Sequence, residues 1–442
     1  NAWLKIYDKP VLYFPYFFHP DPTVKRQSGF LMPNFKTSNN SGTSIQIPYY
    51  KVISERKDLT LFPRVFFDNE ILIQTEYRQA NKDSDLFLDF SFNNDSEKTK
   101  SHFFADISSN KPNQTLNLHL ENVSNDTYLK KQNINSPIIN DNSSLHSYVD
   151  YYSFNQDSSF DISFEVFENL GLTKSDRYEY IFPIFSYEKY LYNDEDINGD
   201  LIFNIRGFQK NYNTNSDEGV LINDLKYSSF PKISSSMDGL MTNYKLLFRN
   251  LNSTTENSDT FKNGEDHQLL SIFSLEHKLP LKKENQNSIS LFSPKIAARY
   301  SPNSTKNNSN LNKKINYDSI FSLDRIDDTS VEGGGSLTLG AEYSLRNKEE
   351  DKNFISLSVA NVLRTNENAD LPKLYGFSEK RSDFIGSIDF LPSKFFDISY
   401  QFSLDKKLDR SNYNLVKTNI NINNFVTSFE FLEEDNYLNE DS

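Results

Sequence analysis

The sequence predicts an all-β protein that forms a transmembrane antiparallel β-barrel, and three observations support this fold class. Apolar and polar residues alternate strictly in many segments, as expected for strands with two unlike faces. The composition favours strands, since 37 Phe and 25 Tyr stand among 442 residues. No apolar run of about 18 residues is present, which excludes a spanning helix, whereas a membrane barrel needs alternating segments of only roughly 10 residues.

The alternation is clearest in the part of the chain that follows residue 70. Leu116, Leu118 and Leu120 alternate with polar residues, and the segments 160–166 and 396–404 repeat the pattern. Further segments of this kind are 71–78, 85–92, 336–343, 354–363, 383–390 and 413–422. We expect roughly 20 strands and no convincing helix, with Tyr and Phe at the strand ends forming the interfacial girdles of the barrel.

The connectors between these segments differ in length. The tight connector 391–393 contrasts with the long polar connectors 251–266 and 301–316. Membrane barrels have short turns at one end and longer loops at the other. We therefore expect the long connectors to lie on one side of the membrane and the tight turns on the other.

A soluble β-sandwich would show the same alternation, so strand length and strand number have to decide. Sandwich strands average about 5–6 residues and open sheets seldom exceed about 10 strands, whereas many of these segments reach roughly 9–11 residues. A membrane barrel is therefore favoured over a set of stacked soluble domains.

The charge and the cysteine content exclude several classes of function. The formal net charge is −14, and no basic stripe is interleaved with aromatic residues, which argues against nucleic-acid binding. Cysteine is absent, so this sequence can form neither disulfides nor thiolate metal sites. The chain begins at Asn1 without a signal stretch and ends in a polar tail, so we expect a piece of a longer precursor that lacks its closing strand.

No catalytic motif stands out in the sequence. The six histidines, at positions 19, 102, 119, 146, 267 and 277, lack metal-ligand spacing, and no Ser/His/Asp set can be assembled from spacing alone. The glycine-rich segment 332–340 lacks the ending of a phosphate-binding loop, so its glycines are expected to mark a kinked strand start. The acidic runs 327–328 and 194–196 are expected in solvated turns. We therefore expect neither an enzyme nor a cofactor.

The N-terminal stretch 10–33 contains five prolines beside strand-forming aromatic residues. Proline has no backbone N–H to give to a sheet ladder, so within sheets it is confined to edges, strand starts and bulges. The stretch is therefore expected to form an edge, or a seam between two sheets.

Several motifs follow one another in this part of the chain. They are Pro10-Val-Leu-Tyr-Phe-Pro-Tyr16, Lys25-Arg-Gln-Ser-Gly-Phe-Leu-Met-Pro33, Ile47-Pro-Tyr-Tyr50, Asp58-Leu-Thr60 and Glu76-Tyr-Arg78. In this order they resemble motifs of the LPS-assembly protein LptD family. Fainter similarity continues in 123–129, where Asn125 replaces the usual Asp, and in 321–334, where 326–328 replaces a commoner Phe-x-Gly.

The resemblance implies the end of a periplasmic β-jellyroll, followed by an outer-membrane barrel of about 26 strands of which this chain would hold about 20. Residues 1–22 would be the end of the jellyroll and its crossover, and residues 23–442 the barrel, truncated at its C-terminus. The junction between them would contain Pro10, Tyr13, Pro15, Tyr16, Arg26 and Gly29.

Pro33 and Pro48 match prolines of the family's lateral gate. Each proline removes a donor from the ladder, and their separation suits neighbouring strands of a hairpin. The first strands would then part more easily. A simpler role, in which the two prolines only protect an edge from aggregation, stays open at this point.

The function implied is insertion of lipopolysaccharide (LPS) into the outer leaflet through a laterally gated barrel in the cell outer membrane. The partners implied are LPS, an LptE-type plug lipoprotein and a periplasmic LptA-type bridge protein. Two alternatives remain: a general outer-membrane porin or receptor barrel, and a secreted β-rich adhesin. Retention in outer membranes through a carbonate wash would separate a barrel from an adhesin.

Overall fold

The computed structural model describes residues 2–6, 9–14, 26–38, 42–67, 70–94, 99–192, 197–212, 216–234, 238–327, 329–348, 352–393, 395–422 and 425–434. The chain divides into two compact units. Unit 1 holds Asn1–Asp150 and Val166–Arg177, and unit 2 holds Tyr151–Glu165 and Tyr178–Ser442. The strands β12 (Ser144–Phe154) and β13 (Ser158–Asn169) contribute residues to both units.

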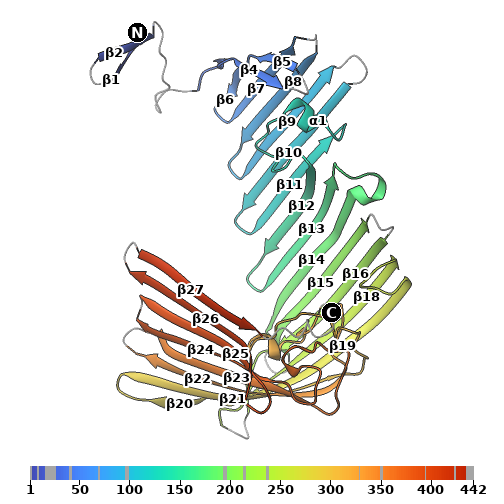
Figure 1. The fold of residues 1–442 in the computed structure, drawn as a ribbon, viewed down its shortest axis with the longest axis vertical. Coiled ribbons are helices and arrows are strands. Elements are labelled where there is room, and N and C mark those ends of the chain that lie inside the picture. Colours follow the sequence, from blue (N-terminus) through green and yellow to red (C-terminus); the bar gives the residue numbers. More distant parts are fainter. Residues whose placement is uncertain are drawn as a thin grey trace. The chain divides into compact units, whose positions relative to one another are not determined.

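Unit 1 begins with a separate two-stranded antiparallel sheet, formed by β1 (Ala2–Ile6) and β2 (Lys9–Phe14). A larger antiparallel sheet follows (Figure 1). Its strands are β3 (Gly29–Phe30), β4 (Asn34–Ser38), β5 (Gly42–Gln46), β6 (Tyr49–Ser54), β7 (Lys57–Phe66), β8 (Ile71–Ala80), β9 (Ser84–Asn94), β10 (Thr99–Lys111) and β11 (Gln114–Val123). One short helix, α1 (Tyr128–Gln132), follows β11, although the sequence indicated no helix.

Unit 2 continues the antiparallel pattern with longer strands. They are β14 (Tyr178–Tyr192), β15 (Asn198–Tyr212), β16 (Ser216–Ser229), β17 (Lys232–Ile233), β18 (Met241–Glu256), β19 (Gly264–Lys278), β20 (Leu281–Glu284), β21 (Ser288–Ser301), β22 (Gly334–Asn347), β23 (Lys352–Arg364), β24 (Phe384–Ser393), β25 (Phe396–Leu404), β26 (Ser411–Ile422) and β27 (Phe425–Glu434). Short 3-10 turns occur at Ser319–Phe321 and Leu374–Gly376 here and at Lys174–Arg177 in unit 1. The nearly all-β chain confirms the predicted fold class.

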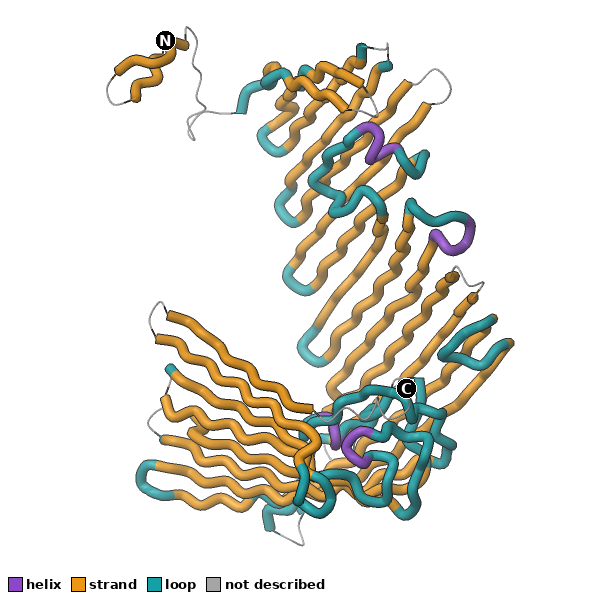
Figure 2. The backbone as a smooth tube through the Cα atoms, in the orientation of Figure 1, coloured by secondary structure: helices purple, strands orange, loops and turns teal. Residues whose placement is uncertain are grey.

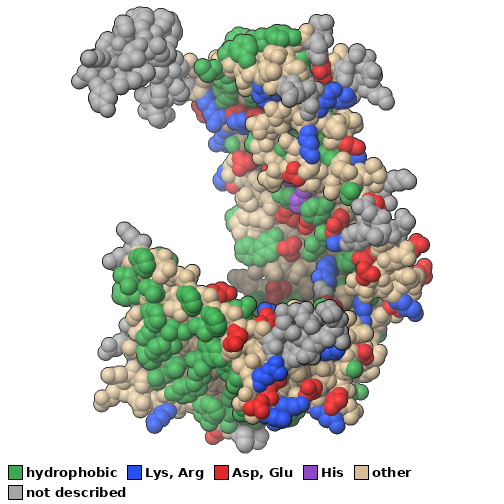
Figure 3. Space-filling model, in the orientation of Figure 1, with side chains coloured by type: hydrophobic (Ala, Val, Ile, Leu, Met, Phe, Trp, Pro, Cys, Tyr) green, Lys and Arg blue, Asp and Glu red, His purple; other side chains and the backbone are tan. Residues whose placement is uncertain are grey.

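In each unit, the strands of the large sheet present one polar and one apolar face. Residues directly opposite each other in an antiparallel ladder point to the same face. In unit 1 one row runs through Thr60, Glu76, Asp89, Phe104 and Glu121 and is polar except for Phe104. The next row, on the other face, runs through Leu59, Tyr77, Leu88, Ala105 and Leu120 and is apolar. In unit 2, hydrophobic side chains gather over β22–β27 (Figure 3). Two unlike faces are what a barrel strand needs between lipid and a wet interior.

Most connectors are short, and a few are long. In unit 1 the turns 55–56, 81–83 and 112–113 join successive hairpins at one end of the sheet, and the long connector 124–143 leaves from the opposite end. In unit 2 the connectors 302–333 and 365–383 form the coil that Figure 2 shows in teal beside the strands.

One predicted connector is shorter than expected. Most of 251–266 belongs to strands, because β18 continues to Glu256 and β19 begins at Gly264. The polar residues there still pair across the ladder, for example Asn252 with His267 and Ser253 with Asp266. Backbone pairing thus extends beyond the apolar part of these strands, and only 257–263 remains as the connector.

Two buried clusters lie beneath the long connectors, on the polar side of each sheet. In unit 1, Tyr128 and Leu129 of α1 pack against Phe66, Leu72 and Phe104. In unit 2, residues of 302–333 and 365–383 pack against β21, β23 and β24. The connectors therefore fold onto the sheet instead of extending from it. No helix in the described ranges is long and apolar enough to cross a membrane.

Candidate functional site: the first strands and the polar face

The large sheet begins with a pair of chain segments, 29–38 and 42–54, and the pairing of both is interrupted. The ladder between β3 and β6 ends at the pair Phe30–Tyr49, and the ladder between β4 and β5 resumes at the pair Asn34–Gln46. Between these pairs, residues 31–33 lie opposite residues 47–48. Three residues opposite two form a bulge, so pairing is locally lost on both strands.

Pro33 and Pro48 lie within these interruptions, in neighbouring strand segments. The Leu31 N–H donates to the Pro48 carbonyl at 2.8 Å. In an antiparallel ladder such a bond is normally returned by the N–H of the accepting residue. Proline has no N–H, so Pro48 accepts a hydrogen bond that it cannot return. Pro48 is buried and Pro33 is exposed.

A third proline continues the interruption into the next strand. The Ile47 N–H donates to the carbonyl of Pro63 in β7 at 3.3 Å, and Pro63 cannot return this bond either. Pro63 was not among the predicted gate residues, although it follows Pro48 at the same interval that separates Pro48 from Pro33. That repeated interval was the signal that could have identified it.

The segment before β3 is fastened to the sheet by side chains. Arg26 Nη1 lies 2.8 Å from Asp58 Oδ2 of β7, and the Val52 N–H donates to Ser28 Oγ at 2.9 Å. Gly29 then begins the ladder opposite Tyr50. An added Cβ at Gly29 would meet nothing within 4 Å, so space does not require glycine there.

Two of the other predicted junction residues, Pro10 and Tyr13, lie in the separate two-stranded sheet. Pro10 pairs opposite Lys5 and Tyr13 opposite Trp3. Pro15 and Tyr16 lie outside the described residues. Of the predicted junction set, the structure therefore places only Arg26 and Gly29 at the first strands of the large sheet.

A buried hydrogen-bonded chain lies on the polar face of unit 1, beneath α1. Tyr128 Oη lies 2.7 Å from Ser91 Oγ, which lies 2.6 Å from His102 Nδ1. His102 Nε2 lies 3.2 Å from Asp89 Oδ1, and Gln74 Nε2 donates to both oxygens of Asp89 at 3.0 Å. The acceptor character of Asp89 places the ring proton on Nε2, so the Ser91 hydroxyl donates to Nδ1 and the Tyr128 hydroxyl donates to Ser91.

This chain joins Ser, His and Asp, a set that sequence spacing could not assemble. Burial raises the pKa of Tyr128 to about 12, so its phenol stays protonated and covers Ser91. The His102 and Asp89 side chains have no exposed surface. A substrate cannot reach a serine that is sealed in this way, so the chain holds the connector 124–143 on the sheet.

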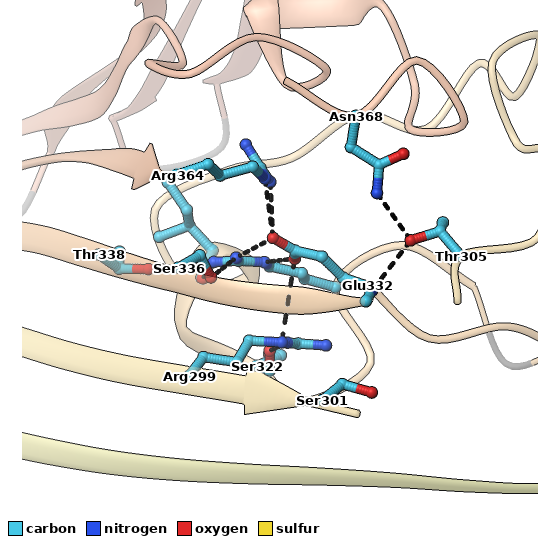
Figure 4. Close-up of polar contacts among 12 residues, drawn as sticks. Arg299, Ser301, Thr305, Ser322, Glu332, Ser336, Thr338, Arg364 and Asn368 are labelled. Carbon is cyan, nitrogen blue, oxygen red and sulfur yellow. Dashed lines mark hydrogen bonds and ion pairs between the residues drawn. The ribbon is translucent and has the colours of Figure 1, made fainter. Parts of the chain in front are cut away.

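An ion cluster fastens the connector 302–333 in unit 2 (Figure 4). Arg325 donates from Nε to Glu332 Oε2 at 2.6 Å and from Nη2 to Oε1 at 2.8 Å. Arg364 of β23 donates to Glu332 Oε1 at 3.0 Å, and Arg299 Nε of β21 lies 3.9 Å from Oε2. All four side chains are at most 5% exposed. One buried carboxylate thus holds three guanidinium groups and joins the connector to two strands.

The neighbours of Arg325 strengthen this anchorage. Asp324 pairs with Lys226 of β16 at 2.5 Å and with Arg249 of β18 at 3.4 Å. Phe377 of the connector 365–383 makes cation–π contacts with Arg325 and Arg364, whose guanidinium carbons lie 5.1 and 4.2 Å from its ring centre. Both long connectors are therefore bound to the polar face through the same cluster.

Electrostatics keep Glu332 ionised. Burial by itself raises the pKa of the Glu332 carboxyl, but the guanidinium groups of Arg325, Arg364 and Arg299 outweigh burial and hold the pKa well below its usual range. The following glycines begin β22 as predicted: Gly334 has a φ of +80°, and a Cβ on Gly333 would lie 2.2 Å from the Asn303 carbonyl oxygen. The motif positions Arg325 and Glu332 were recognisable in the sequence, whereas Arg299 and Arg364 were not.

Among the described residues, the remaining acidic and histidine positions do not gather into a metal site. No group of three or more possible metal ligands occurs within the described ranges. Of the acidic runs, Asp327 accepts a hydrogen bond from Thr329, whereas Asp328 and 194–196 lie outside the described residues.

Comparison with known proteins decides the family. The family described as "LptD: LPS transport system D" matches residues 96–442, more than half of the chain. The chain belongs to the LptD family. Because this is a family of transport and assembly proteins of the outer membrane, the predictions of an outer-membrane location and of a protein that is not an enzyme are confirmed.

Individual LptD relatives match over shorter segments. The LPS-assembly protein LptD of Pseudomonas entomophila is 40% identical over 85 residues, which are 19% of this chain and 9% of that protein. The LPS-assembly protein LptD of Pseudomonas aeruginosa is 32% identical over 103 residues, which are 23% of this chain and 11% of that protein. The matched segments thus span about a tenth of these relatives.

A solved structure was also matched. The alcaligin outer membrane receptor FauA from Bordetella pertussis aligns with a TM-score of 0.26 and 8% identity, over 93% of this chain and 74% of that chain. This score is too low to support an argument about this chain.

Proposed function

We propose that this chain forms the barrel of an outer-membrane translocon, which inserts LPS into the outer leaflet by parting its first strands sideways from the last. The carrying observation is the double interruption at residues 31–33 and 47–48, where Pro33 and Pro48 lie in neighbouring segments. Membership of the LptD family supplies the substrate class, LPS. A porin or receptor barrel would gain nothing from a weakened first pair of strands.

The energetics favour opening at these strands. A backbone hydrogen bond contributes a net of about 0.5–1.5 kcal/mol in water, and more in lipid, where a freed group finds no water. Lateral opening has to break all the bonds of one strand pair together. Each bond that a proline removes therefore lowers the cost of opening, and two missing bonds shift the open population by roughly tenfold or more.

The division of the chain and its partners belong to the same proposal. Residues 1–22 would end a periplasmic jellyroll that receives LPS from an LptA-type bridge, and residues 23–442 would form the barrel. Pro10, Tyr13, Pro15 and Tyr16 would guide the crossover toward Arg26 and Gly29. A wide barrel cannot fill its interior with its own side chains, so an LptE-type lipoprotein would plug it. Co-purification of such a lipoprotein with the full-length protein tests this part.

The gate is tested by replacing both prolines, Pro33→Ala and Pro48→Ala, in the full-length protein in cells. The alanine introduced by Pro48→Ala has a backbone N–H that can return the bond from Leu31, so the closed form becomes more stable and LPS delivery slows. Growth should weaken and sensitivity to large hydrophobic antibiotics should rise, at an unchanged amount of protein in the outer membrane.

A matched control is Pro294→Ala, because Pro294 lies inside β21 opposite Ala341, away from both interruptions. This variant should keep a normal barrier. If the double variant also keeps a normal barrier, the two prolines protect an edge and do not operate a gate.

A further inference from the structure

An open cavity of about 750 Å³ lies on the polar face of unit 1, at the end of the sheet where the turns 55–56 and 81–83 lie. Its lining includes Arg26, Tyr50, Arg56, Asp58, Arg78 and Phe87. The volume falls within the range of small-molecule sites, roughly 300–1,000 Å³. Neither the interruptions at the prolines nor the buried networks beneath the connectors account for this cavity.

The wall of the cavity follows from the strand register. Asp58 of β7 lies opposite Arg78 of β8, Arg78 opposite Phe87 of β9, and Phe87 opposite Asp106 of β10. These side chains therefore share one face of the sheet and form one continuous row. Arg26 reaches the row from the segment before β3, where it pairs with Asp58.

Four separate sequence motifs converge on this cavity. Arg26, Tyr50, Asp58 and Arg78 each come from a different motif among those that resemble the LptD family. These motifs are spread over the first strands, and only the antiparallel register brings these four side chains to one place. The cavity is thus the point at which the motifs meet.

Guanidinium groups in this cavity can receive an anionic group. Within the described part of the chain, Arg56 is exposed and its side chain makes no hydrogen bond or ion pair. Arg78 donates from Nη2 to Glu76 at 2.6 Å and lies 5.3 Å from the centre of the Phe87 ring, with the rest of its fork available. Arginine forks bind phosphate oxygens in pairs of parallel hydrogen bonds.

Carboxylates in the same cavity argue against a bare anion. Asp58 is already paired with Arg26, but Glu55, Asp85 and Asp106 also line the cavity. They would repel a free phosphate, yet they can accept hydrogen bonds from hydroxyl groups. The rings of Tyr50 and Phe87 offer apolar surface for the face of a sugar. The complete set suits a ligand with phosphate, hydroxyl groups and apolar ring faces together.

We propose that this cavity binds the phosphorylated sugar headgroup of LPS, an inference that rests on the proposed function. Arg56 and Arg78 hold the phosphate, and Glu55 and Asp85 accept from the sugar hydroxyls. The cavity adjoins Arg26, which immediately precedes the interrupted strands. The headgroup therefore rests beside the first strands before they part.

The test uses the full-length protein with its partner lipoprotein in detergent. It compares LPS binding by the double variant Arg56→Gln, Arg78→Gln with LPS binding by the control variant Lys82→Gln. Lys82 is an exposed cation of the turn 81–83 that does not line the cavity. The double variant should bind purified LPS about tenfold more weakly, since each charge-assisted bond is lost, whereas Lys82→Gln should bind it normally. LPS stripped of its headgroup phosphates should bind the wild type and the double variant equally.

Several results would overturn the assignment. Equal loss for intact and dephosphorylated LPS would mean that the two arginines act on the structure, and displacement of LPS by inorganic phosphate at matched concentration would mean a bare-phosphate site. Unchanged LPS binding by the double variant would show that this cavity is not the headgroup site. The single variant Arg56→Gln guards against misfolding, because the Arg56 side chain makes no hydrogen bond or ion pair within the described residues, and this variant should still weaken LPS binding.

Photo-crosslinking in cells separates this inference from the proposed function. A crosslinking residue at Gln79 lines the cavity, and one at Phe35 lies in β4 beside the interruption. LPS should crosslink at both positions. Crosslinking at Phe35 without any at Gln79 would refute the cavity and leave the gate, whereas LPS at neither position would refute both.

Discussion

The first strands and the strands β18 and β19 pair in opposite ways. β18 and β19 keep an unbroken register from the pair Met241–Lys278 to the pair Thr255–Gly264. The ladder of the first strands stops at Phe30–Tyr49 and starts again at Asn34–Gln46. Both regions alternate polar and apolar residues, so alternation does not explain the difference. The position of proline does, because it removes donors at particular points of the ladder.

Side chains repeat the same contrast. Arg249 of β18 is 1% exposed and binds Asp224 of β16 through two hydrogen bonds of 2.6 Å. Arg26, which fastens the entry to the first strands, is 61% exposed. An exposed ion pair adds little stability, whereas a buried one is costly to break. The strands around Arg249 are therefore stabilised by a buried ion pair, whereas the first strands, where opening is proposed, have an exposed one.

The largest effect is expected from Glu332→Gln, which removes the carboxylate of the buried ion cluster in unit 2. The substitution leaves Arg325, Arg364 and Arg299 buried without their carboxylate. Breaking a buried pair from one side costs about 3–5 kcal/mol. Denaturant unfolding should show this loss, and protease should cleave 302–333 more readily.

The matched control is Glu379→Gln, which breaks an exposed pair with Lys406 on the connector side of unit 2. Its effect on unfolding should be small, because exposed pairs are screened by water. Similar losses for both variants would contradict the role given to the buried cluster.

A smaller effect is expected from Pro63→Ala, which should make the first strands more like β18 and β19 by restoring a backbone donor. The new N–H can return the bond from Ile47, so β7 should hold its neighbour more firmly by about 0.5–1.5 kcal/mol. Amide exchange of residues 47–52 should slow, with no change in β18. Faster exchange there would mean that Pro63 is needed for the fold of this ladder.

The smallest effect is expected from pH. The pKa of Glu332 is held below its usual range, so its stabilising contribution is complete above the unfolded value of about 4.3 and is lost only as pH falls through the lower folded pKa. Protease cleavage of 302–333 should therefore be constant between about pH 5 and pH 8. An increase in cleavage between neutral pH and the lower limit would contradict the ionised, buried carboxylate.

Much of the fold could be predicted from the sequence, because alternation is a local signal. Leu116, Leu118 and Leu120 revealed a strand with an apolar face, and the motifs around Pro33 and Pro48 revealed the family. The helix α1 was not predicted, since five residues are too few to show a helical period.

The side-chain networks could not be predicted in the same way. Arg325 and Glu332 lie close in sequence, but Arg299 and Arg364 come from separate strands and meet them only through the register. The cavity proposed to bind the headgroup likewise depends on the register, which places Asp58 opposite Arg78 and Arg78 opposite Phe87. Sequence spacing does not give the register that sets which side chains of neighbouring strands lie opposite each other.

Amide hydrogen exchange of the full-length protein in lipid measures whether the prolines leave the first strands easier to open. Residues 29–54 should exchange at least roughly tenfold faster than the paired amides of β18 and β19, because fewer bonds close their ladder. In the Pro33→Ala, Pro48→Ala variant this difference should shrink, while β18 and β19 stay unchanged. Equal protection of the two regions in the wild type, or no change in residues 29–54 on replacing both prolines, would contradict the account.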